Sequence, residues 1–354
     1  MEFANNLILI GAGLVTLSIF AGLVSSRIGA PLLLVFLALG MLAGEDGPGG
    51  ILFNDFQAAY IAGSIALAII LFDGGLRTTR QSIRVAWGPS LVLATAGVLV
   101  TAILCGLFAA WILDLHWLQG LLIGSTVAST DAAAVFFLLH LHGLGLKERP
   151  GATLEVESAI NDPMAIVLTI LCIELLQSGA TALSWQAAID FAAMFMVQIA
   201  GGALFGLIGG YVLLQIINRL EIASGLYPIF ALAFALLIFG LAQAAGASGY
   251  MAVYLAGLVL GLRRHRATQL INRFYDGLAW LCQIMMFLML GLLVTPSELL
   301  PDMAPALAIA FFLIVAARPI AVGLCLWPFR FTWREVLFIA WVGLRGAVPI
   351  FLGT

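Results

Sequence analysis

Several polar side chains and a proline stand together in the stretch ESAINDPMA, between apolar sequences on both sides. Glu157 and Asn161 are four residues apart, as are Ser158 and Asp162, so on a helix they form two adjoining stripes of one polar face. The proline that follows has no N–H and leaves the carbonyl four residues before it without its usual donor. A carboxylate, an amide, a hydroxyl and a spare carbonyl are hard oxygen ligands, which suit an alkali cation or a proton better than zinc. The stretch therefore predicts a monovalent cation site at Asp162, with a buried structural network as the alternative.

A second group of hydroxyl side chains precedes Asp131 in the stretch STVASTDAAAV. Thr130 or Asp131 would cap a half-helix that begins at this point, so we expect the helix to break near residues 126–130. Asp131 would then face the positive end of that half-helix. Irregular backbone inside a membrane is tolerated only where it is buried in protein or lines a cavity. Thr130 and Asp131 are therefore candidate ion ligands, and a cap without an ion role is the other interpretation.

The composition places these clusters in a membrane. The chain has 354 residues, of which 63% are hydrophobic and 9% are charged, and its mean hydropathy is +1.14. A soluble domain carries about 25% charged residues. The sequence therefore predicts an all-α polytopic membrane protein whose partner is the lipid bilayer. Nothing in it suggests nucleic-acid binding or a cofactor.

Twelve segments are apolar enough to be spans, taking roughly 20 residues as the length that crosses a bilayer. They cover residues 6–25, 31–44, 57–76, 85–112, 116–141, 150–177, 186–217, 225–246, 247–263, 270–294, 303–328 and 333–354. The twelfth ends at Thr354 without a polar tail. We expect a thirteenth span to be missing from this sequence.

The basic residues give the orientation. Every Lys and Arg outside the segments follows an odd-numbered one. By the positive-inside rule these loops are cytoplasmic, which places the N-terminus outside. A wrong number of segments would have broken this alternation.

A few charges remain inside the segments, where each costs about 2.5–3.5 kcal/mol on insertion scales. Arg318 needs an acidic partner, and we expect a structural ion pair with Glu157. Arg345 lies in GLRGAVP, where glycines and a proline predict a second helix break. At this break the positive charge of Arg345 would offset the negative end of a half-helix. At the first break the negative charge of Asp131 would offset the positive end of one. Asp73, in LFDGGL, is either a solvated helix end or a residue of the ion entrance.

The two predicted breaks lie in segments 116–141 and 333–354, which are seven places apart and therefore run in opposite directions. Paired discontinuous helices in inverted halves of a chain indicate a transporter binding site. The sequence thus predicts an inverted-repeat antiporter fold with two crossed discontinuous helices.

The motifs STDAAAV, ESAINDPMA, AARPI, WVGLRGAVPI, LALAII and DGGLR together resemble the monovalent cation:proton antiporter family. The resemblance is to its NhaP branch, near the bacterial CvrA-type potassium/proton antiporters, and it covers essentially the whole chain. It implies that Asp162 binds the ion beside Asn161 and Ser158, with Thr130 and Asp131 in the unwound segment. It also implies a Glu157–Arg318 ion pair and Arg345 as the basic residue of the second crossing helix.

The resemblance further implies a homodimer in the bacterial inner membrane, built as one transmembrane antiporter domain over residues 1–354. Its dimerisation part would cover about 1–76 and 186–263, and its ion-translocating core about 85–177 and 270–354. Members of this subgroup carry a cytoplasmic region after the membrane part, which is absent from this sequence.

The expected activity is secondary transport and not enzyme chemistry. Asp162 would bind either a proton or one cation, so that one-for-one exchange by alternating access is electroneutral. The resemblance favours K⁺, and a Na⁺/H⁺ antiporter is the alternative. A cation channel would need a filter-like repeat, and an intramembrane hydrolase using Asp131 and Asp162 would need a nucleophile or metal motif. The sequence contains neither.

Overall fold

The computed structural model describes residues 2–28, 32–132, 136, 139, 146–178, 185–343 and 348, and these residues are almost entirely helical. Each of the twelve apolar segments contains a helix. The long elements are α1 (Glu2–Ile28), α2 (Leu32–Ala43), α3 (Phe56–Arg77), α4 (Arg80–Val92), α5 (Val98–Leu113), α6 (Trp117–Thr126), α8 (Glu148–Gln177), α9 (Trp185–Arg219), α10 (Leu226–Ala244), α11 (Gly249–Gly261), α12 (Thr268–Leu293), α14 (Met303–Phe312), α15 (Arg318–Leu326) and α16 (Trp333–Trp341). Among the described residues, 7 helices are long and apolar enough to cross a membrane.

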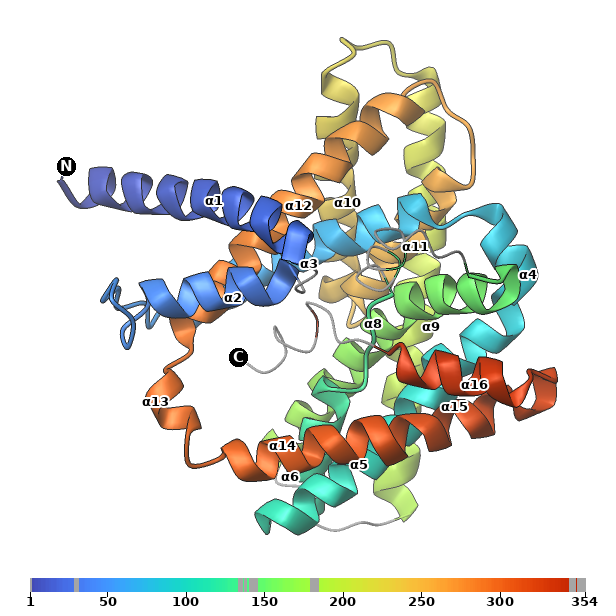
Figure 1. Ribbon diagram of the computed structural model, residues 1–354. Coiled ribbons are helices and arrows are strands. Elements are labelled where there is room, and N and C mark those ends of the chain that lie inside the picture. Colours follow the sequence, from blue (N-terminus) through green and yellow to red (C-terminus); the bar gives the residue numbers. More distant parts are fainter. Residues whose placement is uncertain are drawn as a thin grey trace.

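The helices pack in two groups that meet along α8 (Figure 1). In the first group α11 packs on α3, α9 and α10, and α12 packs on α2 and α3. In the second group α4, α6 and α16 pack on α8, α5 packs on α6, and α15 packs on α16. From the second group, α8 reaches across to α9, α11 and α3. The helix that carries the polar stretch therefore lies at the boundary between the two groups.

The position of α12 differs from the expectation that residues 270–354 form one unit with the core. Its extensive contacts are with α2 and α3, and it also touches α1 and α10. Gly40 of α2 and Gly291 of α12 bring these backbones together, since a Cβ on Gly40 would lie 2.8 Å from the Cα of Gly291. The packing thus assigns α12 to the first group, and the second group resumes at α14.

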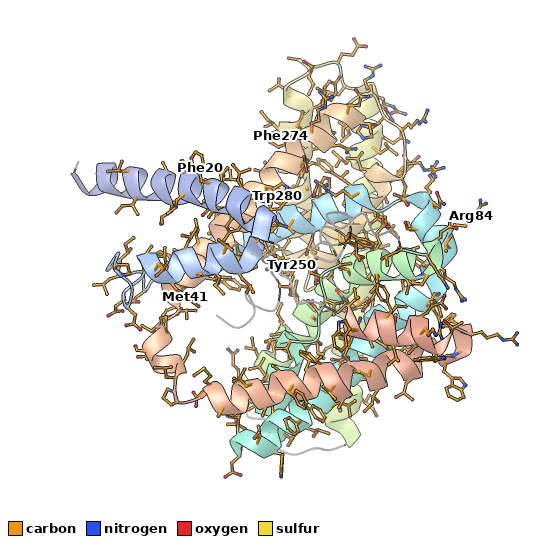
Figure 2. All side chains as sticks on the ribbon, viewed as in Figure 1. Phe20, Met41, Arg84, Tyr250, Phe274 and Trp280 are labelled. Carbon is orange, nitrogen blue, oxygen red and sulfur yellow. The ribbon has the colours of Figure 1, made fainter. Side chains whose placement is uncertain are left out.

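The outer surface is apolar and the interior holds polar contacts. Figure 2 labels Phe20 and Trp280, whose side chains are 60% and 44% exposed. Tyr250 is buried in the interior and donates a hydrogen bond to the Ser64 hydroxyl over 3.1 Å. This distribution is the one expected of a helix bundle that faces lipid.

Two π-helical turns interrupt the long helices of the second group. One, Leu93–Gly97, joins α4 to α5, and the other, Leu313–Ala317, joins α14 to α15. They fall in segments seven places apart, as the inverted repeat requires, and each segment directly precedes one of the predicted helix breaks. π-Turns widen a helix locally and are frequent at functional sites. The second one places Arg318 at the first position of α15.

The start of the discontinuous segment is fixed by a close approach of α5 and α6. Gly106, Gly120 and Gly124 lie at this contact, where a Cβ on Gly124 would overlap the carbonyl oxygen of Ala102. Small residues allow this approach of two helices within a membrane, where van der Waals packing drives association. The position of α6, and of the hydroxyl residues after it, depends on these glycines.

Gly124→Ala should therefore lower the stability of the protein. The added methyl group meets backbone and not a flexible side chain, and overpacking of this kind costs about 1–3 kcal/mol in the free energy of unfolding. A thermal melt of the detergent-purified protein should show a lower midpoint. Gly240→Ala in α10 is the matched control, because a Cβ at that position meets nothing within 4 Å. Equal melting points for the two variants would contradict this account of α6.

Candidate functional site

α8 carries the central side chains of the site. It is continuous from Glu148 to Gln177, so Pro163 lies inside an unbroken helix. Proline has no N–H to donate to the carbonyl of Ala159, which leaves that oxygen available next to Asp162. The predicted polar face is present, with Glu157 and Asn161 fully buried and Ser158 and Asp162 partly exposed.

The predicted break in the preceding segment is also present. α6 ends at Thr126, and residues 128–131 belong to no helix. The hydroxyls of Ser125 and Thr126 donate to the carbonyls of Leu122 and Ile123, over 2.8 Å in both cases, and so satisfy acceptors at the helix end. The half-helix that Thr130 or Asp131 would cap lies mostly outside the described residues.

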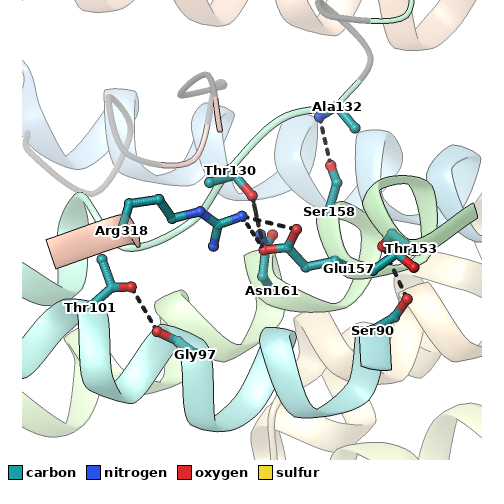
Figure 3. Close-up of polar contacts among 10 residues, drawn as sticks. All are labelled: Ser90, Gly97, Thr101, Thr130, Ala132, Thr153, Glu157, Ser158, Asn161 and Arg318. Carbon is teal, nitrogen blue, oxygen red and sulfur yellow. Dashed lines mark hydrogen bonds and ion pairs between the residues drawn. The ribbon is translucent and has the colours of Figure 1, made fainter. Parts of the chain in front are cut away.

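An ion pair and two hydrogen bonds connect α8 to this unwound segment and to α15 (Figure 3). The Arg318 Nη2 lies 2.8 Å and 3.0 Å from the two carboxylate oxygens of Glu157. The Thr130 hydroxyl donates to Glu157 over 3.3 Å and accepts from the Asn161 amide nitrogen over 2.7 Å. The side chains of Arg318 and Glu157 are 2% and 0% exposed. This pair therefore neutralises one of the buried carboxylates.

Asp162 lies on the neighbouring stripe of α8 and makes no salt bridge with a Lys or Arg among the described residues. The side chain of Ser129 interacts with its carboxylate, and Asp131 and Glu157 are close enough to act on it electrostatically. The Ser158 hydroxyl accepts the backbone N–H of Ala132 over 3.0 Å, which ties the unwound segment to α8. Asp162 thus differs from Glu157, which is paired with Arg318.

One buried oxygen atom of the polar face has no hydrogen-bond donor. The Asn161 Oδ1 is buried and has no hydrogen-bond partner in the part of the chain that the structure describes. A buried acceptor left without a donor costs about 1–3 kcal/mol, so its position calls for a ligand. Together with hydroxyl groups and the carbonyl freed by the proline, the donor set is made of oxygen alone. Such a set suits an alkali cation or a proton.

One residue of the predicted site, Asp73, has its contacts elsewhere. Asp73 pairs with Arg77 over 2.6 Å, and Arg77 also reaches Asp276 over 2.6 Å. These contacts place Asp73 where α3 meets α12, in an ion pair with Arg77 that Asp276 shares, so an ion-binding role for Asp73 stays a prediction. Arg345 lies outside the described residues.

Two further residues lie at the site: Ser129, which was not among the predicted ion ligands, and Gly343, which the sequence pattern assigned only to the second helix break. Ser129 stands beside Asp162, and its signal was its place four residues after Ser125 in the hydroxyl-rich stretch. Gly343 follows α16, and a Cβ there would lie 3.1 Å from the Arg318 Nε and 3.2 Å from a methyl group of Thr130. Only a residue without a side chain fits between these two groups without displacing them. Gly343 thus brings the end of α16 against the ion pair.

Comparisons with known proteins give one consistent result. The transmembrane sodium/hydrogen exchanger family matches residues 14–354. A K⁺/H⁺ antiporter NhaP2 from Shewanella sp. (strain ANA-3) is 51% identical over 350 residues, which are 98% of this chain and 60% of that protein. A K⁺/H⁺ antiporter NhaP from Alkalimonas amylolytica is 51% identical over 352 residues, again 60% of its length. The chain therefore spans about 60% of the length of these curated relatives.

The fold has a counterpart among solved structures. The sodium proton antiporter MjNhaP1 from Methanocaldococcus jannaschii, solved at pH 8, superposes with a TM-score of 0.86 and 25% sequence identity. The match covers 99% of this chain and 85% of that one. The expected all-helical antiporter fold is thus confirmed.

Proposed function

Because the chain belongs to the sodium/hydrogen exchanger family, we propose that it exchanges a monovalent cation, K⁺ in the first instance, for a proton across the membrane. The observation that carries the proposal is the difference between two carboxylates of the polar face of α8, Glu157 and Asp162. Arg318 neutralises Glu157 over 2.8 Å, whereas Asp162 has no such partner among the described residues. Asp162 also directly follows Asn161, whose buried amide oxygen has no hydrogen-bond partner among them. Asp162 is the group that the exchanged ions would share.

The exchange would proceed by competition for one carboxylate. A proton or a K⁺ ion each neutralises the single charge of Asp162, so the loaded site has the same charge in both directions. Asn161, Ser158, Thr130 and Asp131 would supply or position the surrounding oxygens. One-for-one exchange is then electroneutral, which avoids the cost of about 2.3 kcal/mol per charge for each 100 mV of membrane potential.

In this proposal one helix group moves and the other stays fixed. The group of α4–α8 with α14–α16 would carry the site, and the group of α1–α3 with α9–α12 would form the scaffold and the contact of a homodimer. The packing of α12 on α2 and α3 supports this boundary in place of one at residue 270. The scaffold remains fixed, so alternating access would come from movement of the α8 face against α9 and α11.

The chain is a multi-pass membrane protein, and the alternation of basic loops supports an orientation with the N-terminus outside the bacterial inner membrane. In this orientation the starts of α4 and α8 are cytoplasmic. The oxygen ligands alone do not separate K⁺ from Na⁺, since cavity size and field strength decide between them. The preference for K⁺ rests on relatives that are named K⁺/H⁺ antiporters.

Adding one salt at a time to proteoliposomes that hold a pH gradient tests the proposal. K⁺ should collapse the gradient at sub-saturating concentrations where Na⁺ and Li⁺ act less, and clamping the membrane potential with an ionophore should leave the rate unchanged. Preference for Na⁺ would identify the Na⁺/H⁺ alternative. Cation flux that follows voltage and ignores the pH gradient would indicate a channel and contradict exchange.

A further inference from the structure

A cavity of about 340 Å³ opens where α4 and α8 begin, at the end of the second group that carries basic loops. Its polar lining consists of Thr79, Gln81, Ser82, Lys147, Glu148 and Glu155. The Lys147 Nζ lies 3.6 Å from the Oε1 of Glu335, a residue that is not part of the cavity lining. Glu335 therefore offsets part of the positive charge of Lys147. The two carboxylates leave the cavity with an excess of negative charge.

Glu155 forms the inner end of this lining. Its side chain is partly exposed, and it accepts a hydrogen bond from the Ser82 hydroxyl over 2.8 Å. Glu148, near the rim, accepts from the Gln81 amide over 2.6 Å. On the facing helix α11, Tyr254 is close enough to Glu155 for an electrostatic interaction, and it hydrogen-bonds toward Thr78. A hydroxyl holds Glu155 without neutralising it, and no Lys or Arg among the described residues forms a salt bridge with it.

The cavity lining continues along α8 to the ion site. Residues 148, 151, 152 and 155 line the cavity, and residues 158, 159 and 162 continue the same helical face at spacings of three and four. Ser158, Ala159 and Asp162 are all partly exposed. One and two turns beyond Asp162, the same face is closed by Ile166 and Thr169, each 1% exposed. Partly exposed residues thus continue this face of α8 beyond the cavity lining as far as Asp162, and the face is buried after it.

We propose that Glu155 is the cytoplasmic recruitment site for the transported cation, from which the ion passes along this face to Asp162. The two residues are seven apart, so their Cα atoms are separated by about 10 Å along the helix axis. A fixed negative charge at the mouth of a narrow, poorly hydrated path raises the local concentration of cations. Glu155 would attract the cation and pass it to the site at Asp162, and it would not itself be a ligand of the ion at that site. This inference rests on the proposed exchange activity and orientation.

The first test separates loading from turnover. Glu155→Gln should raise the apparent KM for K⁺ on the cytoplasmic side about three- to tenfold and leave kcat within about twofold, because electrostatic attraction acts on encounter. The difference should shrink as inert salt screens the charge. Glu174→Gln, at the exposed opposite end of α8, is the matched control and should change neither constant. An unchanged KM for Glu155→Gln, or a loss confined to kcat, would overturn the proposal.

The second test does not depend on transport. Single cysteines are introduced as Glu155→Cys, Ser158→Cys and Thr169→Cys in a background without Cys105, Cys172, Cys282 and Cys325. An impermeant maleimide applied to inside-out vesicles should label the first two and leave the third unmodified. Failure to label position 155, or equal labelling at position 169, would overturn the path. Failure of the exchange proposal is distinct from both outcomes, since labelling would then follow the predicted pattern while K⁺ produced no proton flux.

Discussion

Asp162→Asn should abolish cation-driven proton movement, with a loss of at least about a hundredfold in proteoliposomes. An amide of the same shape neither releases a proton nor presents a negative charge to K⁺, so both half-reactions fail together. A neutral side chain also removes the cost of a charge in the membrane. The variant should therefore insert and melt at a temperature equal to or above that of the unchanged protein.

The matched control is Asp302→Asn, which makes the same change on an exposed residue in the turn before α14. This variant should transport as the unchanged protein does. Substantial K⁺-driven proton flux in Asp162→Asn would remove Asp162 from the role given to it and would point to Asp131. A thermal melt accompanies every transport assay, because a loss of flux is informative only when the variant is folded.

Arg318→Met should be the most destabilising single change in the site. It leaves the Glu157 carboxylate buried without its cation, and breaking a buried pair from one side costs about 3–5 kcal/mol in the free energy of unfolding. Both side chains are almost fully buried, so water does not replace the guanidinium. Reduced yield and a lower melting temperature in detergent are the expected results.

The double variant Glu157→Leu with Arg318→Met tests whether the lost stability comes from the unpaired charge of Glu157 or from lost packing. Replacing both members of a buried pair by apolar groups is often neutral, so the double variant should regain most of the lost stability. Arg266→Gln is the control for an exposed pair, since the side chains of Arg266 and its partner Glu221 are 48% and 86% exposed and such pairs contribute about 0–1 kcal/mol. A single Arg318→Met variant as stable as Arg266→Gln would contradict the structural role of the pair.

The sequence was most informative where burial is expensive. A charge inside a membrane needs a partner, which was enough to predict that Arg318 and Glu157 lie together, and the structure brings them within 2.8 Å. Clustered hydroxyl residues likewise predicted the end of α6 at Thr126. Both features follow from residue types whose burial or position has a large energetic cost. They can therefore be predicted from one sequence.

Features that depend on which helices touch were not predicted. Hydropathy places α12 in the membrane but contains no information about its neighbours, and only the close approach of Gly40 and Gly291 shows that it packs on α2. Arg77 pairs with Asp73 and also with Asp276, and this second contact could not be predicted because Asp276 is distant in sequence. The sequence did not indicate that Gly343 lies against Arg318 and Thr130. A glycine at a helix break is expected for its backbone conformation alone, whether or not another side chain lies against it.

Proton release on cation binding tests the central claim most directly, because it requires neither a vesicle nor a gradient. K⁺ is added to weakly buffered, detergent-solubilised protein at a pH where proton and cation compete, and the protons set free are measured with a dye. If Asp162 binds either ion, K⁺ should release protons up to a limit of one per K⁺ bound, approached as the pH is lowered and the carboxyl group starts fully protonated, and Asp162→Asn should release none. K⁺ binding without proton release, or undiminished release from the Asp162→Asn variant, would contradict exchange at this carboxylate.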